Sequence, residues 1–167
     1  MGSISPESSK MKIEHYFCQE NNPELQLTYW NILGACKGNE GQPLKNMHCD
    51  SFKGMNSLSC NPVNQDVKIE DLIWYLNDGT IGSPNKILDQ KLNEVLNLNV
   101  KFLKINRKAA LDGFKIILEK KYKGTLKRSI IEKWVDNWTG VSHQDNLRPY
   151  CQVIVYWLQK KLKINKV

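Results

Sequence analysis

The chain changes character once along its length, and this change limits the folds open to it. Residues 12–62 are rich in Asn, Gly, Cys and His and show little helical periodicity. This composition is typical of a loop-rich module that is ordered by turns, ligands or a metal rather than by a large core. From Pro84 onward, apolar residues recur at helical spacing. The sequence therefore predicts an α+β protein with a small loop-rich module, a β-hairpin and a mainly helical C-terminal half.

The hairpin is predicted over residues 72–82, between the two parts. Its turn is Asn77-Asp78-Gly79, which joins a strand over residues 72–76 to a short return strand over residues 80–82. Asp-Gly between two apolar runs favours a tight turn, because Gly tolerates positive φ. We place the division between a module of residues 1–83 and a helical region of residues 84–167.

Four helices are expected in the second half. The first carries residues 88–96 and ends at a break marked by Asn97 and Asn99. Thr125 is the predicted cap of the third helix, and Pro149 opens the last. The second and longest has an amphipathic pattern, carried by Phe102, Ile105, Ala109, Phe114, Ile116, Ile117 and Leu118.

Charge and hydropathy narrow the functional classes. The chain has 167 residues, of which 41% are hydrophobic and 25% charged, as in an ordinary globular protein. Its apolar runs are too short to span a bilayer and its first ten residues do not resemble a signal peptide, so we expect a cytoplasmic protein without a membrane partner. The net charge of +7 is concentrated in residues 101–133, a segment that contains eleven basic and three acidic residues. That segment is either a solvated helical face or a surface that binds a polyanion.

Three polar stations in the first module stand out together. They are Glu14-His15 in "KIEHYF", Asn31 in "YWNILGAC" and Asp50 in "HCDSFKG". Each one alone is ordinary, as a strand end, a helix cap or a turn. Their order and spacing are more specific than any of them singly.

In these motifs the sequence resembles the HNH endonucleases, which have a ββα-metal fold. That family places an acidic residue and His at the end of a first strand, Asn in the connecting loop, and His, Asn or Asp at the start of the next helix. The match continues through "NPVN", "DGTI" and "LNEVLNLN" and covers most of the chain from about Lys12. The motifs follow the order seen in a group of bacterial HNH proteins, which are often encoded beside ATPases in antiphage systems of the Septu and retron-associated kind.

The resemblance implies roles for these residues in phosphodiester hydrolysis. His15 would be the general base, because an imidazole titrates near neutrality. Asn31 would fix the orientation of His15, through its side chain or through the loop around it. Glu14 and Asp50 would hold one divalent cation, and hard oxygen ligands suit Mg²⁺.

Basic residues and the remaining histidines extend this interpretation. The expected phosphate or nucleic-acid contacts are Lys53, Lys104, Arg107 and Lys108, although Lys53 is equally well explained as a solvated helix residue. Three roles remain for His48: a loop residue, a metal ligand or a group that supports the site. We favour the loop residue. His143 is interpreted as a surface residue.

A structural zinc ion is the second cofactor to consider. Cys36 and Cys49 match one half of the two Cys pairs that hold zinc in many HNH proteins, but no pair lies upstream of Glu14. Either the chain is N-terminally incomplete or it manages without zinc, since four ligands are the norm for structural zinc. The other thiols are expected to pack or to stay unpaired, and they belong to Cys18, Cys60 and Cys151.

The main hypothesis is a metal-dependent endonuclease that acts on DNA, or on RNA, as the effector of an antiphage system with an ATPase partner. The alternative is a catalytically incomplete, HNH-derived module that binds nucleic acid or protein. A third reading is a helical adaptor that uses the Trp and Leu faces of residues 125–163, which are otherwise plain core.

Overall fold

A computed structural model describes residues 7, 10–62, 68–140 and 147–164. It contains both helices and small antiparallel sheets, which confirms the α+β class. The chain groups into two compact units. We call residues 4–74 and 81–101 the sheet unit, and Tyr75–Thr80 with the chain from Phe102 onward the helical unit. The division expected between residues 83 and 84 stays a prediction.

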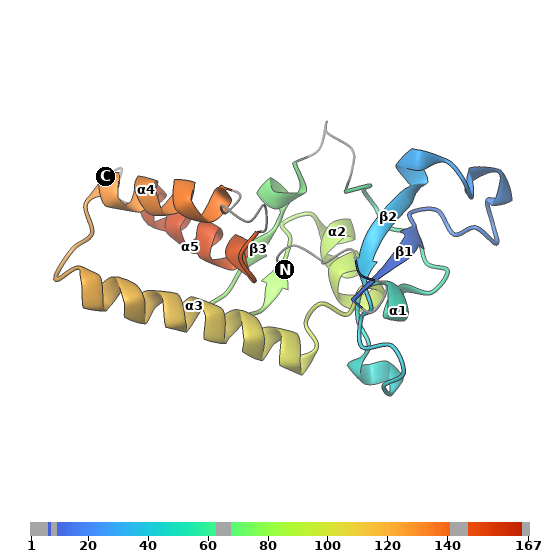
Figure 1. Ribbon diagram of the computed structural model, residues 1–167, viewed down its shortest axis with the longest axis horizontal. Helices are drawn as coiled ribbons and strands as arrows, with labels where there is room; N and C mark the ends of the chain where they lie inside the picture. Colours follow the sequence, from blue (N-terminus) through green and yellow to red (C-terminus); the bar gives the residue numbers. More distant parts are fainter. Residues whose placement is uncertain (1–6, 8–9, 63–67, 141–146, 165–167) are drawn as a thin grey trace. The chain divides into compact units, whose positions relative to one another are not determined.

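The sheet unit is built on an antiparallel ribbon of two strands. Strand β1 (Met11–His15) pairs with β2 (Ile32–Cys36) in a register that sets Glu14 opposite Leu33 and His15 opposite Ile32. The short helix α1 (Asp50–Lys53) follows β2 in the chain and lies beside the ribbon (Figure 1). Strand, strand and helix therefore follow one another in this unit.

The rest of the sheet unit supports this ribbon and helix. Helix α2 (Lys86–Gln90) is capped by Asn85, whose side chain accepts hydrogen bonds from two N–H groups of the first turn. The helix continues as a π-helical turn over Lys91–Val95. The predicted break after this helix is confirmed, because Asn97 has a φ of 48°. The side chain of Asn97 then donates to the Met47 carbonyl at 2.7 Å. This contact ties the break to the segment just before α1.

The predicted hairpin turn is confirmed, but its strands are shorter than expected. Strand β3 covers Trp74–Tyr75 and β4 covers Ile81–Gly82. Residues Ile69–Leu72 form a 3₁₀ turn instead of the start of a strand. The Asp78 carboxylate accepts hydrogen bonds from the Thr80 N–H and hydroxyl, both at 2.9 Å, and so holds Thr80 in the turn.

Gly79 provides a test of how this turn is fixed. Its φ is +86°, and a Cβ atom added here would lie 2.0 Å from the Lys104 carbonyl oxygen. Gly79→Ala should therefore lower the free energy of unfolding by about 2–3 kcal/mol or more, through both backbone strain and the clash. Urea denaturation followed by circular dichroism measures this change.

Gly113 supplies the matched control for this substitution. It lies inside helix α3 (Lys101–Lys121), and a Cβ added there would meet nothing within 4 Å. Gly113→Ala should stabilise the protein by about 0.5–1 kcal/mol, because Gly is unfavourable in a helix interior. Equal effects of the two substitutions would contradict the close approach at Gly79.

The helical unit packs α3, α4 (Arg128–Thr139) and α5 (Cys151–Ile164) around one apolar core (Figure 1). The predicted third and last helices are confirmed, and the last begins two residues after Pro149. The predicted cap at Thr125 is wrong, because α4 begins at Arg128 and its N-cap is Lys127. The core cluster consists of Phe114, Leu118, Ile131, Ile154 and Leu158. Aromatic rings pack edge-on around Phe114, with centroid distances of 5.4 Å to Trp134, 5.3 Å to Trp138 and 6.2 Å to Trp157. No helix in the described part of the chain is long and apolar enough to cross a membrane.

One part of the predicted amphipathic pattern is wrong. Ile105, Ile116 and Ile117 were expected on the buried face of α3, but they are 54%, 51% and 52% exposed. The face that α3 buries consists of Leu103, Arg107, Leu111, Phe114 and Leu118. These residues are spaced three or four apart and form one stripe, so a residue off that stripe faces water whatever its hydropathy.

Candidate functional site

Two carboxylates and two lysines meet where β1 faces α1. Alternate residues of a strand share one face, so Lys12 and Glu14 point to the same side of the ribbon. The Lys53 ammonium lies 2.5 Å from a Glu14 carboxylate oxygen and also donates to the His15 carbonyl at 3.1 Å. Lys12 pairs with Asp50. The two carboxylates are therefore balanced by two ammonium groups.

Lys53 is the most deeply buried of these charges, with 1% of its surface exposed. A charge at such a position is tolerated only when it is paired and hydrogen-bonded, as Lys53 is. This finding corrects the reading of Lys53 as a solvated helix residue, whereas a contact of Lys53 with a phosphate stays a prediction. Lys53 contacts the Glu14 carboxylate and the His15 carbonyl and so holds the end of β1.

The two carboxyl groups of the site titrate as a pair. Burial, together with a hydrogen bond to Asp50, raises the pKa of Glu14 above its ordinary value. Burial works in the same direction on Asp50, but hydrogen bonds from Glu14 and Lys12 hold the pKa of Asp50 below its ordinary value. Glu14 is thus the first of the two carboxyls to take up a proton as the pH falls.

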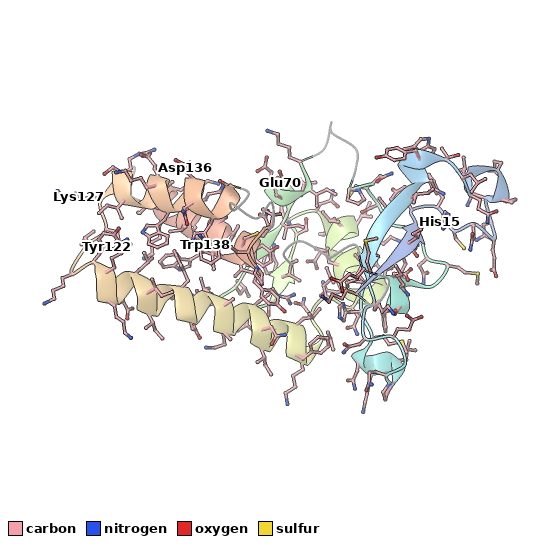
Figure 2. All side chains as sticks on the ribbon, viewed as in Figure 1. His15, Glu70, Tyr122, Lys127, Asp136 and Trp138 are labelled. Carbon is pink, nitrogen blue, oxygen red and sulfur yellow. The ribbon has the colours of Figure 1, made fainter. Side chains whose placement is uncertain are left out.

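His15 follows Glu14 at the end of β1, where Figure 2 labels it. Its Nε2 lies 2.9 Å from the carbonyl oxygen of Gln26, in the loop between the two strands. A carbonyl oxygen can only accept, so Nε2 carries the hydrogen in this contact. The neutral imidazole then has its free lone pair on Nδ1. This arrangement leaves Nδ1 as the nitrogen that can take a proton.

Asn31 orders the loop that holds His15. Its side chain is completely buried. The amide oxygen accepts from the Phe17 N–H at 2.7 Å, and the amide nitrogen donates to the Leu25 carbonyl at 3.1 Å. Because Leu25 precedes Gln26, these bonds fix the carbonyl against which His15 rests. These contacts are with the loop, and none of them reaches the His15 ring, so the role of Asn31 in orienting His15 stays a prediction.

A cavity of about 370 Å³ brings most of these groups together. Its lining includes Glu14, His15, Asp50 and Lys53, with apolar residues of β2 and the adjoining loops forming the remaining wall. Asn31 does not line the cavity and acts from behind His15. The three stations predicted from the sequence therefore converge within one unit, two on the cavity and one as its support.

A second cluster lies at the other end of β2. Cys36 ends this strand, and His48 and Cys49 come directly before α1. Their ligand atoms all lie within 4.8 Å of one another, and His48 Nδ1 is 3.1 Å from Cys49 Sγ. The favoured interpretation of His48 as a loop residue is thus incomplete, because His48 is buried and completes a group of three. Its position next to Cys49 in the sequence was the available signal.

A backbone hydrogen bond positions this cluster, and contacts within it shift the pKa values of its two thiols. The His48 N–H donates to the Gly38 carbonyl at 2.9 Å, and Gly38 has a φ of +55°. A hydrogen bond from the Cys49 thiol, followed by the contact with His48, lowers the pKa of Cys36 to about 4. The same bond raises the pKa of Cys49. Two sulfurs and one imidazole nitrogen are the donor types that zinc prefers, so the residues fit a zinc ion that takes a fourth ligand from elsewhere.

The predicted nucleic-acid contacts on α3 are only partly accessible. Arg107 is buried, with 6% of its surface exposed, and its Nε donates to the Gly79 carbonyl at 2.5 Å. The prediction for Arg107 is therefore wrong, because this guanidinium fastens the hairpin turn onto α3. Lys104 pairs with Asp78 at 2.9 Å and Lys108 pairs with Asp112 on the helix surface. A contact of these two lysines with nucleic acid stays a prediction.

Two members of the site were missed by sequence reasoning. Lys12 could have been found, because a lysine two residues before Glu14 in a strand must share its face. The Gln26 carbonyl could not, since a backbone group leaves no trace in residue identity. Comparisons with protein-family models and with curated proteins find no significant match to this chain.

Proposed function

We propose that this protein is a metal-dependent endonuclease of the HNH type, which hydrolyses phosphodiester bonds in nucleic acid, with DNA as the favoured substrate. One observation carries the proposal. The His15 imidazole is held through Nε2 by a backbone carbonyl and lines the same cavity as the Glu14 and Asp50 carboxylates. A base with a fixed tautomer next to a carboxylate pair is what hydrolysis by an activated water requires.

Each residue has a distinct task in this proposal. Nδ1 of His15 takes the proton of the attacking water, and the hydrogen bond to Gln26 stabilises the imidazolium that results. Glu14 and Asp50 would hold a divalent cation, with Mg²⁺ expected from their hard oxygen ligands. When bound, the cation would stabilise the negative charge that develops at phosphorus and on the leaving oxygen. Asn31 keeps the loop in place.

The lysines set the starting charge of the site. With Lys12 and Lys53 paired to the carboxylates, the four groups sum to zero rather than to −2. The Lys53 side chain is only 1% exposed and stays with Glu14, whereas the Lys12 side chain is 23% exposed and can turn away. We therefore expect the Lys12 ammonium to move away from Asp50 when a cation binds.

Zinc at Cys36, His48 and Cys49 would support the same site through Cys49, which precedes Asp50 and also lines the cavity. These residues join the end of β2 to the residue before Asp50, so a metal ion there would hold the start of α1 against the ribbon. Its role would be structural, because two thiols and an imidazole are the ligand types of structural zinc sites. Cys49 also lines the cavity around His15, so the two sites adjoin.

The alternative is an HNH-derived module that binds nucleic acid or protein without cleaving it. Two observations favour it: the carboxylates are already neutralised by lysines, and the thiol–imidazole cluster offers three ligands where structural zinc takes four. The role as effector of an antiphage system with an ATPase partner is proposed from the resemblance to the HNH family alone.

Cleavage of plasmid DNA in Mg²⁺ or Mn²⁺, compared with EDTA, tests the proposal. Cleavage should require the cation, and the double variant Glu14→Gln, Asp50→Asn should lower the rate by about 10²-fold or more. Glu24→Gln, at an exposed glutamate in the same unit, is the matched control and should change nothing. Cleavage that continues in EDTA would contradict the proposal, and DNA binding without Mn²⁺ binding would favour the alternative.

A further inference from the structure

The helical unit has two adjoining hollows on the surface of α5. The first, of about 230 Å³, is lined by Tyr75, Leu111, Tyr156 and Trp157 among others, with Lys160 and Lys161 at its edge. The second, of about 200 Å³, is lined by residues of α3 and α5 and by the turn after α3. Both hollows include Trp157 and Lys161. One indole ring therefore forms part of the wall of each.

Trp157 is half-buried and surrounded by cations. One edge of its ring packs against Phe114 in the core, which fixes the indole in place. The Lys115 and Lys161 ammonium groups lie 5.6 Å and 5.4 Å from the centroid of the ring. Residues three and four apart on a helix are neighbours, so Lys160 and Lys161 stand directly beside Trp157 on α5. Trp157 is therefore a fixed aromatic ring with three lysines next to it.

The same pairing of ring and cation recurs across this unit. The Lys121 ammonium lies 5.7 Å from the ring centroid of Tyr122 and 5.3 Å from that of Trp134. The Arg148 guanidinium lies 4.8 Å from the ring centroid of Trp138. Aromatic rings with cations at hand are thus a repeated feature of this unit, and not a single accident of packing at Trp157.

The charge of the molecule is divided between the two units. The segments that form the helical unit, residues 75–80 and 102–167, contain 15 basic and 6 acidic residues, a balance of +9. The rest of the chain then carries −2 of the net +7. The lining of the first hollow contains no carboxylate, and that of the second contains only Glu119. The charge of these hollows is therefore complementary to a polyanion.

We propose that these two hollows bind a single-stranded nucleic acid. A base stacks against Trp157, and the flanking phosphates pair with Lys115, Lys160 and Lys161. An aromatic ring in a hollow can meet only a base that has left a duplex, which favours a single strand over double-stranded DNA. A base that stacks on the indole displaces a lysine, and that lysine gains a phosphate in exchange. The recurrence of ring and cation favours a strand over a lone nucleotide.

Fluorescence anisotropy of a fluorescein-labelled oligothymidine, measured in EDTA, tests this proposal. EDTA excludes cleavage, so the result does not depend on the proposed nuclease activity. Trp157→Leu should weaken binding about tenfold, whereas Trp157→Phe should retain most of the affinity. Circular dichroism shows whether each variant is folded.

A pair of lysine variants keeps the test decisive if Trp157→Leu fails to fold. Lys160→Gln with Lys161→Gln should lower the slope of log K against log[salt] by about 1.4, which is 0.7 for each phosphate contact with a single strand. The control removes two exposed charges outside the hollows, by Lys127→Gln with Lys133→Gln. Equal losses in the two pairs would overturn the proposal, since the effect would then be one of general charge. A duplex that binds as tightly as the single strand would overturn it too.

Discussion

His15→Ala should lower the rate of Mg²⁺-dependent plasmid cleavage by about 10²–10⁴-fold, the range that a positioned general base contributes. The substitution removes Nδ1, the only nitrogen that the hydrogen bond to Gln26 leaves free to take a proton. The fold should survive, because that bond is exposed and water can replace the imidazole at the Gln26 carbonyl. Affinity for DNA should therefore be unchanged. Initial rates on supercoiled plasmid, together with binding measured in EDTA, separate the two effects.

The control for this variant is His143→Ala, which removes the same side chain far along the sequence from residues 14, 15, 31 and 50. His143, expected at the surface, lies outside the described residues. Added imidazole should restore part of the cleavage by His15→Ala, because it returns a base to the space that the side chain leaves. Undiminished cleavage by His15→Ala would show that another group is the base. Loss of DNA binding along with cleavage would show that His15 acts in binding.

Cys36→Ser and Cys49→Ser should each remove bound zinc and lower the melting temperature. Structural zinc contributes about 10–16 kcal/mol in small zinc-finger peptides at pH 7, so losing even 4 kcal/mol is a large fraction of a typical stability. In a chain of this size such a loss lowers Tm by about 8–16 °C. The loss should fall on the sheet unit, where the cluster joins β2 to α1. Metal content by mass spectrometry and thermal unfolding followed by circular dichroism measure both effects.

His48→Ala tests the third ligand and should release zinc as the cysteine variants do. Cys60→Ser is the matched control, because Cys60 is half-buried and lies outside the cluster. Protein purified in the presence of zinc that carries no metal, with cysteine variants that melt like the original chain, would contradict a zinc site. The cluster would then be three packed side chains only.

Local patterns in the sequence were enough to predict most of the elements. The turn at Asp78-Gly79 was predicted correctly because positive φ at one residue is a property of Gly itself. The break at Asn97 was correct for a similar reason, since Asn tolerates a φ of 48° better than most residues. Helical spacing found α3, but it could not tell which apolar residues face the core. Ile116 and Leu118 look alike in the sequence, and only the position of α4 and α5 decides between them.

Residue identity also determined which groups are available for chemistry. Side-chain chemistry is carried by residue type, so these groups were all visible in the printed sequence. They are the acid–imidazole pair at residues 14 and 15, Asn31, Asp50 and the cluster's two thiols. What those groups do depends on their partners. Lys53 looked like a surface cation and is a buried partner of Glu14, and Arg107 looked like a nucleic-acid contact and is a buried partner of Gly79.

The sequence by itself determined the α+β class, the hairpin turn and the identity of the candidate site residues, since these follow from backbone propensity and side-chain chemistry close together in the chain. Only the tertiary structure decided that Lys53 and Arg107 are buried and that His48 joins Cys36 and Cys49. It also decided that the Gln26 carbonyl fixes the His15 tautomer. Each of these depends on contacts between residues far apart in the chain or on a backbone atom, and packing alone sets them.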